Sequence, residues 1–185
     1  PMDKWDKCEF AVSEDDLEDR VCYGGLDLSS TTDITAFVLV FPPEDENDKY
    51  IILPYFWIPE DNLDLRVRRD HVPYDVWERQ GYLQTTEGNV VHYGYIEKFI
   101  ESLGERFNIR EIAFDRWGAV QMVQNLEGMG FTVVPFGQGF KDMSPPTKEL
   151  MKLVLEQRIA HGGHSVLRWM MDNIFIRTLS LIHIS

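Results

Sequence analysis

Two aspartates in this chain each close a run of apolar residues that is typical of a buried strand. Asp27 stands at the end of a predicted strand over 21–28, and Asp115 at the end of one over 109–115. An ionised carboxylate beside residues such as Leu26 and Phe114 is costly unless it is paired or binds a metal. If the strands are neighbours, the two acids repel each other unless a cation lies between them. The pattern therefore predicts an oxygen-ligand site for Mg²⁺ or Mn²⁺.

Each acid also has a purely structural interpretation. An aspartate at a strand end is often a turn residue, which applies to Asp27, and Asp115 has Arg110 and Arg116 as candidate partners. Asp33, shortly after Asp27, is either an accessory metal ligand or the first residue of an Asx turn. The spacing of these acids leaves the alternatives open.

Other polar groups have weaker signals. The pair His161 and His164 resembles a metal motif, but without a helical frame we interpret both as loop residues. The glycine-containing loop 137–141 follows a predicted strand, so Gln138 and Lys141 are candidate contacts to a phosphate backbone. The sequence contains no P-loop, which excludes an ATPase within this chain.

The elements that must position these residues form an α/β pattern. Predicted strands cover 21–28, 34–41, 50–57, 109–115 and 131–136. Predicted helices cover 63–80 in two pieces around Pro73, 93–107, 119–129, 144–158 with Ser144 as the cap, and a helix or mixed segment over 166–174. We expect a mixed sheet of about five strands, three antiparallel and then two parallel, flanked by helices. Ligands of such sheets gather at the carboxyl ends of strands.

Composition sets the broad class. The 185 residues are 44% hydrophobic, enough for a real core, and the net charge is -13. That charge argues against broad non-specific nucleic-acid binding, although much of it lies in residues 3–19 and 44–48, which we expect to be solvated. Cys8 and Cys22 are expected to be free thiols. Without a membrane-spanning run or a secretory signal, we expect a soluble intracellular protein.

Aromatic residues are expected to build the core rather than a base-stacking platform. This applies to Trp57, Trp77, Trp117 and Trp169, which all have apolar neighbours.

Several blocks of the sequence resemble the nuclease domain of tailed-phage terminase large subunits. They are 25–36, 114–119, 138–146, 148–150 and 161–169. The blocks occur in the family's order and span about residues 21–177 of the chain.

The resemblance implies a ribonuclease H-like fold and a two-metal endonuclease that cuts concatemeric double-stranded viral DNA, with Asp27 and Asp115 as the first two acids. It also implies an upstream ATPase domain, a portal protein and a small terminase subunit as partners, no membrane, and the cytoplasm of a bacterial host. Residues 1–20 would be an acidic linker from the motor, and 21–178 the nuclease domain.

The tail 179–185 departs from the family, and we interpret it as a scar of cloning or sequence assembly. The family's third acid is expected beyond this point, which leaves Asp172 as the nearest remaining acid. We therefore expect weak metal binding and slow cleavage. The alternatives are a catalytically impaired domain that docks DNA or the portal, and another ribonuclease H-like enzyme such as a resolvase or transposase core.

Overall fold

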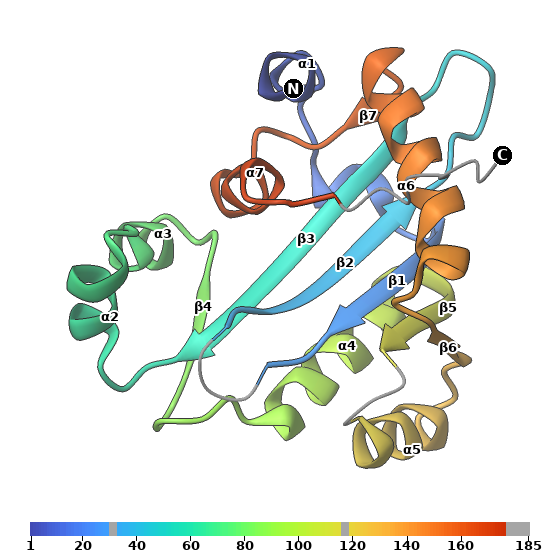
Figure 1. The fold of residues 1–185 in the computed structure, drawn as a ribbon. Coiled ribbons are helices and arrows are strands. Elements are labelled where there is room, and N and C mark those ends of the chain that lie inside the picture. Colours follow the sequence, from blue (N-terminus) through green and yellow to red (C-terminus); the bar gives the residue numbers. More distant parts are fainter. Residues whose placement is uncertain (30–32, 116–118, 177–185) are drawn as a thin grey trace, which may run out of the picture.

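The fold is a mixed sheet with helices on both faces (Figure 1). The computed structural model describes residues 1–29, 33–115 and 119–176. The strands are β1 (Val21–Asp27), β2 (Thr35–Phe41), β3 (Tyr50–Pro59), β4 (Gln84–Thr86), β5 (Asn108–Asp115), β6 (Val133–Phe136) and β7 (Ile159–Ala160). The helices are α1 (Met2–Asp6), the 3-10 turn η1 (Glu14–Leu17), α2 (Leu63–Asp70), α3 (Tyr74–Arg79), α4 (Tyr93–Arg106), α5 (Val120–Gly128), α6 (Phe140–Leu155) and α7 (Ser165–Asp172).

Strand directions confirm the predicted sheet. The order is β4-β3-β2-β1-β5-β6, with β7 paired to β3. β2 pairs antiparallel with both β1 and β3, whereas β5 pairs parallel with β1 and β6 parallel with β5. The two short strands β4 and β7, both parallel to β3, were not predicted.

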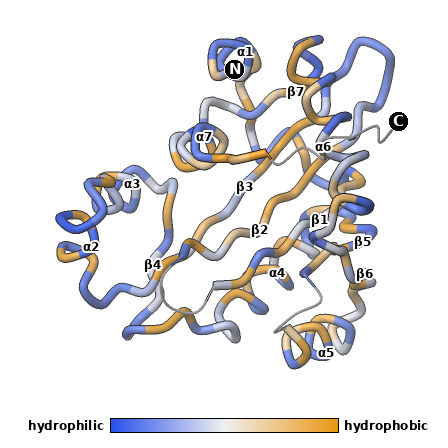
Figure 2. Tube along the Cα trace, viewed as in Figure 1, coloured by the Kyte–Doolittle hydropathy of each residue, from blue (hydrophilic) through white to orange (hydrophobic). Residues whose placement is uncertain are grey.

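Alternation along the strands divides the core between the two faces of the sheet. In β2, Phe37, Leu39 and Phe41 are buried in the same hydrophobic cluster as Ile96 and Ile100 of α4. In β3, the cluster on the other face includes Ile52, Phe56 and Ile58 with residues of α1, α3 and α7. Figure 2 shows hydrophobic residues along these strands and hydrophilic residues in the β2–β3 loop. Helices therefore cover both faces of the sheet.

The N-terminal segment 1–20, expected to be an acidic linker, packs on this framework. Trp5, Cys8 and Leu17 are buried. Arg106 of α4 donates hydrogen bonds of 2.8 Å to the carboxylates of Glu14 and Glu18. A few apolar side chains among many acids are enough to hold the segment against the sheet.

The start of α6 also differs from the prediction. The helix begins at Phe140 after Gly139, and Pro145 and Pro146 lie inside it, so Ser144 is not its cap. Proline lacks the N–H that normally bonds the carbonyl four residues earlier. Those carbonyls belong to Lys141 and Asp142, which are exposed, so water can satisfy them.

The cysteines and the helices bear on two further expectations. Cys8 and Cys22 are buried free thiols, as expected. Among the described residues, no helix combines the length and the apolar character that crossing a membrane requires. Trp117 and the tail 179–185 lie outside the described residues.

Candidate active site

Strand pairing places Asp27 beside Asp115. Leu26 of β1 is the parallel register partner of Phe114 of β5, and each strand ends with the next residue, an aspartate. Parallel neighbours about 4.8 Å apart end side by side. The two acids therefore stand together at the carboxyl edge of the sheet, as predicted from their strand-end positions.

Hydrogen bonds of Ser29, just after β1, reach Asp33 and Thr35. The hydroxyl of Thr35 donates to the carbonyl of Ser29 at 2.7 Å and accepts from the Ser29 N–H at 2.9 Å. The N–H of Asp33 donates to the hydroxyl of Ser29 at 3.1 Å. Ser29 is thus bonded to both Asp33 and Thr35, and Asp33 is exposed and close enough for its charge to act on Asp27.

Asp27, Asp115 and Asp33 lie close enough for their charges to interact. Burial among protein atoms raises the pKa of Asp27, and the charges of Asp115 and Asp33 raise it further. Asp27 still has solvent access, so the site is half-enclosed. Convergent carboxylates in such a place favour a cation, because a cation removes the repulsion between them.

Carboxylate oxygens are the kind of ligand that a hard divalent cation prefers, but few of them lie together at this site. Among the described residues, no group of three or more His, Cys, Asp or Glu side chains is arranged to hold a metal ion. Mg²⁺ commonly binds through one or two protein carboxylates, with water and substrate phosphate completing its ligands. Asp27 and Asp115 satisfy that minimum.

A cavity of about 340 Å³ opens beside Asp27. Its lining includes Asp27, Ser29 and Asp33 near the end of β1, together with Arg66 of α2, Tyr74 of α3 and Trp169 of α7. α2 reaches this edge because β1 and β3 run in the same direction, so the chain leaves β3 at the end of the sheet where Asp27 stands. Carboxylates and a guanidinium thus line one space of small-ligand size.

The remaining sequence candidates lie farther from this pair. Gln138 and Lys141 are exposed in the loop and first helical turn that follow β6, whose last residue Phe136 pairs with Asp115. They share the sheet edge with the acids. Asp172 is exposed at the end of α7, and its charge helps to raise the pKa of Arg168.

The two histidines have structural roles. His161 stacks on Trp5 with ring centroids 4.3 Å apart, and its Nε2 lies 2.8 Å from the Trp5 carbonyl oxygen. His164 caps α7 by accepting the N–H of Leu167 at 3.3 Å. Interpreting both as non-ligands agrees with these contacts. Trp57 and Trp77 are buried, and Trp169 is half-buried against Trp77, 5.7 Å between centroids.

Arg66 and Tyr74 are site residues that sequence reasoning missed. The only available signal was the basic run 66–69 on a predicted helix directly after the third strand. Which of its arginines faces the site depends on how α2 packs.

The fold and the paired strand-end acids define a ribonuclease H-like domain. Comparison with known proteins identifies the family to which it belongs. The family "Terminase large subunit, endonuclease domain" matches residues 2–179. The terminase large subunit of Enterobacteria phage HK97 is 41% identical over 150 residues, which is 80% of this chain and 29% of that protein. Protein YmfN of Escherichia coli K12 is 25% identical over 95% of this chain and 40% of its own length.

Solved structures agree. The crystal structure of the HK97 large terminase superposes with a TM-score of 0.79 at 36% identity, over 91% of this chain and 34% of that one. The large terminase nuclease of thermophilic phage G20c, with bound zinc, has the same fold at 12% identity and a TM-score of 0.54, over 86% of this chain and 75% of that one. This chain belongs to the terminase large-subunit endonuclease family. That membership favours a terminase over a resolvase or transposase core.

Proposed function

We propose that this domain is a divalent-metal-dependent endonuclease that cuts double-stranded phage DNA, with Asp27 and Asp115 as its metal ligands. The observation that carries the proposal is the register of β1 and β5, which ends both strands in adjacent aspartates. Family membership supports the reaction class. The chain covers only 29% of the HK97 protein, so the activities of a whole terminase are proposals here.

Oxygen ligands and like-charge crowding point to Mg²⁺ or Mn²⁺. The G20c nuclease, which shares the fold, has been solved with zinc and with magnesium. In this proposal Asp27 and Asp115 would hold divalent metal, with Asp33 as an accessory ligand. Bound there, the metal would supply an activated water and charge stabilisation for hydrolysis of the phosphodiester.

Other residues receive lesser roles. Gln138 and Lys141 are proposed to contact the DNA backbone, because they share the sheet edge with Asp115. Asp172 is the weakest candidate ligand, since among the described residues the charges that raise the pKa of Asp27 are those of Asp115 and Asp33.

The whole protein is proposed to work in phage DNA packaging in the cytoplasm of a bacterial host. An ATPase domain upstream of residues 1–20, a portal protein and a small terminase subunit would be its partners. The net charge of -13 leaves the domain with little intrinsic attraction for DNA, so those partners would supply most of the engagement.

The described ligand set predicts slow catalysis by this 185-residue chain. Two convergent carboxylates, with Asp33 nearby, bind a metal more weakly than a closed cluster of three or more. A longer terminase chain that adds a further carboxylate should cut faster. Equal rates for the two proteins would contradict this part of the proposal.

Nicking of supercoiled plasmid in Mn²⁺ tests the function, because one cut per molecule is visible even when turnover is slow. Asp27→Asn and Asp115→Asn should each lower the rate at least about 100-fold, since each removes a metal-binding charge. Asp16→Asn, an exposed acid on η1, is the matched control and should nick like the wild type. Metal-independent nicking would contradict the metal requirement, and unchanged rates in both site variants would show that Asp27 and Asp115 are not the ligands. No nicking by the wild type would leave only a DNA- or portal-docking domain.

A further inference from the structure

We propose that Arg66 binds a backbone phosphate of the strand being cut and so positions that strand in the cavity beside Asp27. The inference rests on the proposed function, because it assigns to that site the contact that holds its substrate. Arg66 is the one cationic side chain among the described residues that line the cavity.

The charges that line the cavity favour a phosphate bound to Arg66. Asp27 and Asp33 line the cavity, and a phosphodiester approaching them meets two negative charges. The Arg66 guanidinium in the same lining offsets that repulsion and can bind phosphate oxygens through two parallel N–H donors. In a chain with a net charge of -13, local cations decide where DNA can lie.

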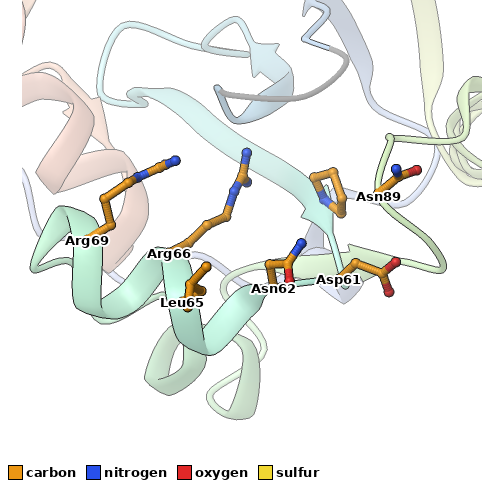
Figure 3. Close-up of a pocket in the computed structure, with 7 residues that line it drawn as sticks. Asp61, Asn62, Leu65, Arg66, Arg69 and Asn89 are labelled. Carbon is orange, nitrogen blue, oxygen red and sulfur yellow. The ribbon is translucent and has the colours of Figure 1, made fainter.

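Arg66 connects the cavity beside Asp27 with a second one. Arg66 also lines a neighbouring cavity of about 210 Å³ with Asn62, Arg69 and Asn89. Figure 3 shows Arg66 and Arg69 extending from α2, with Asn62 beside Arg66 and with Asp61 and Asn89 farther along the cavity. The two arginines and two amides outnumber the single acid Asp61, so this lining suits a strand that passes from Asp27 along α2.

α2 is built to hold Arg66 in place. Asn62 and His71, on either side of the helix, both adopt left-handed backbone conformations, and the Arg66 N–H bonds the Asn62 carbonyl at 2.9 Å. Asp70 accepts from Arg69 Nε at 2.7 Å and from the Tyr74 hydroxyl at 3.1 Å. These contacts tie α2 to α3. Of the two arginines, Arg66 is the one that lines the cavity beside Asp27.

Arg68 provides a matched control on the same helix. It is exposed, its Nε lies 3.4 Å from the Asp64 carbonyl oxygen, and it lines neither cavity. Arg66→Ala and Arg68→Ala make the same change in net charge. Non-specific attraction predicts equal losses of DNA affinity, whereas a phosphate contact predicts a loss for Arg66 alone.

The test is fluorescence anisotropy of a labelled DNA duplex with the full chain in EDTA, over about 25 to 150 mM NaCl. Arg66→Ala should raise the Kd about tenfold and lower the slope of log Kd against log salt by about one, as expected for one lost phosphate contact. Arg68→Ala should leave the slope unchanged. Arg66→Lys should keep the slope and recover part of the affinity, which also guards against a folding defect in the alanine variant.

Equal Kd values and salt slopes for Arg66→Ala and Arg68→Ala would overturn the inference. Because the measurement is made without metal, it is independent of cleavage. Plasmid nicking without an Arg66 effect on binding would sink this inference alone, and an Arg66 effect without metal-dependent nicking would sink the proposed function alone.

Discussion

Leu26 and Phe114 face each other across the parallel strands β1 and β5, and the residue after each is an aspartate. This register is what turns two distant positions in the sequence into one site. A shift of β5 by one residue would remove Asp115 from the end of the pair and turn its side chains to the opposite face. The packing that fixes the register is therefore part of the site.

Gly24 in β1 should be essential to that packing. A methyl group there would lie 2.9 Å from two ring atoms of the buried Phe37 and 3.3 Å from Ile112 Cγ1. Gly24→Ala should lower the free energy of unfolding by about 1–3 kcal/mol, because the core must shift to admit the methyl group. Urea denaturation followed by circular dichroism measures the change.

The neighbouring glycine is the control for that substitution. A Cβ at Gly25 meets nothing within 4 Å. Gly25→Ala should change stability by less than about 1 kcal/mol. Equal losses in the two variants would show that contact with Phe37 is not what makes Gly24 necessary.

The N-terminal segment should stabilise the domain. Trp5 is 3% exposed and stacks on His161, so Trp5→Ala should cost about 3–5 kcal/mol of unfolding free energy. Phe10→Ala, at an exposed aromatic position of the same segment, should cost much less. If thermal unfolding showed no loss for Trp5→Ala, residues 1–20 would be only the linker that the sequence suggested.

Stability should fall in mild acid through His164. Burial lowers the pKa of His164 to about 4 from its ordinary value of 6.5. The unfolded chain therefore binds the proton first, so stability is complete above about pH 6.5 and is lost as the pH falls toward 4, by about 2 kcal/mol. Urea midpoints across this range measure the loss.

His164→Asn separates this titration from that of the carboxylates. Asparagine can still accept the Leu167 N–H as a helix cap, but it carries no titrating group. The variant should show a flatter pH profile than the wild type, with some stability lost at neutral pH because contacts to Phe56 and Tyr82 are removed. An unchanged profile would show that His164 does not control it.

The pKa of Asp27 should report which acids share its site. Asp115→Asn and Asp33→Asn should each lower that pKa in the metal-free protein, Asp115→Asn by more, because each removes a like charge. NMR titration of the labelled Asp27 carboxyl carbon measures the change. Asp172→Asn is the control and should have no effect. A comparable shift from Asp172→Asn would place that acid in the site.

The sequence was sufficient for the main strands and for the strand-end positions of Asp27 and Asp115, because runs of apolar residues that end in an acid mark both. That the two strands are neighbours came from the structure. The sequence was not sufficient where local pattern is weak. β4 and β7 are too short to show an alternation of apolar and polar residues. The proline pair suggested that α6 begins at Ser144, whereas the helix begins at Phe140. The place of Arg66 depends on how α2 packs beyond β3, which no local pattern records.

The most direct test is isothermal titration of Mn²⁺ into the full chain and into Asp27→Asn, with Asp16→Asn as the charge-matched control. The paired strand ends predict saturable binding in the wild type and in Asp16→Asn, and an affinity at least about tenfold lower in Asp27→Asn, where one ligand charge is gone. Identical isotherms for all three proteins would contradict a metal site at Asp27 and Asp115.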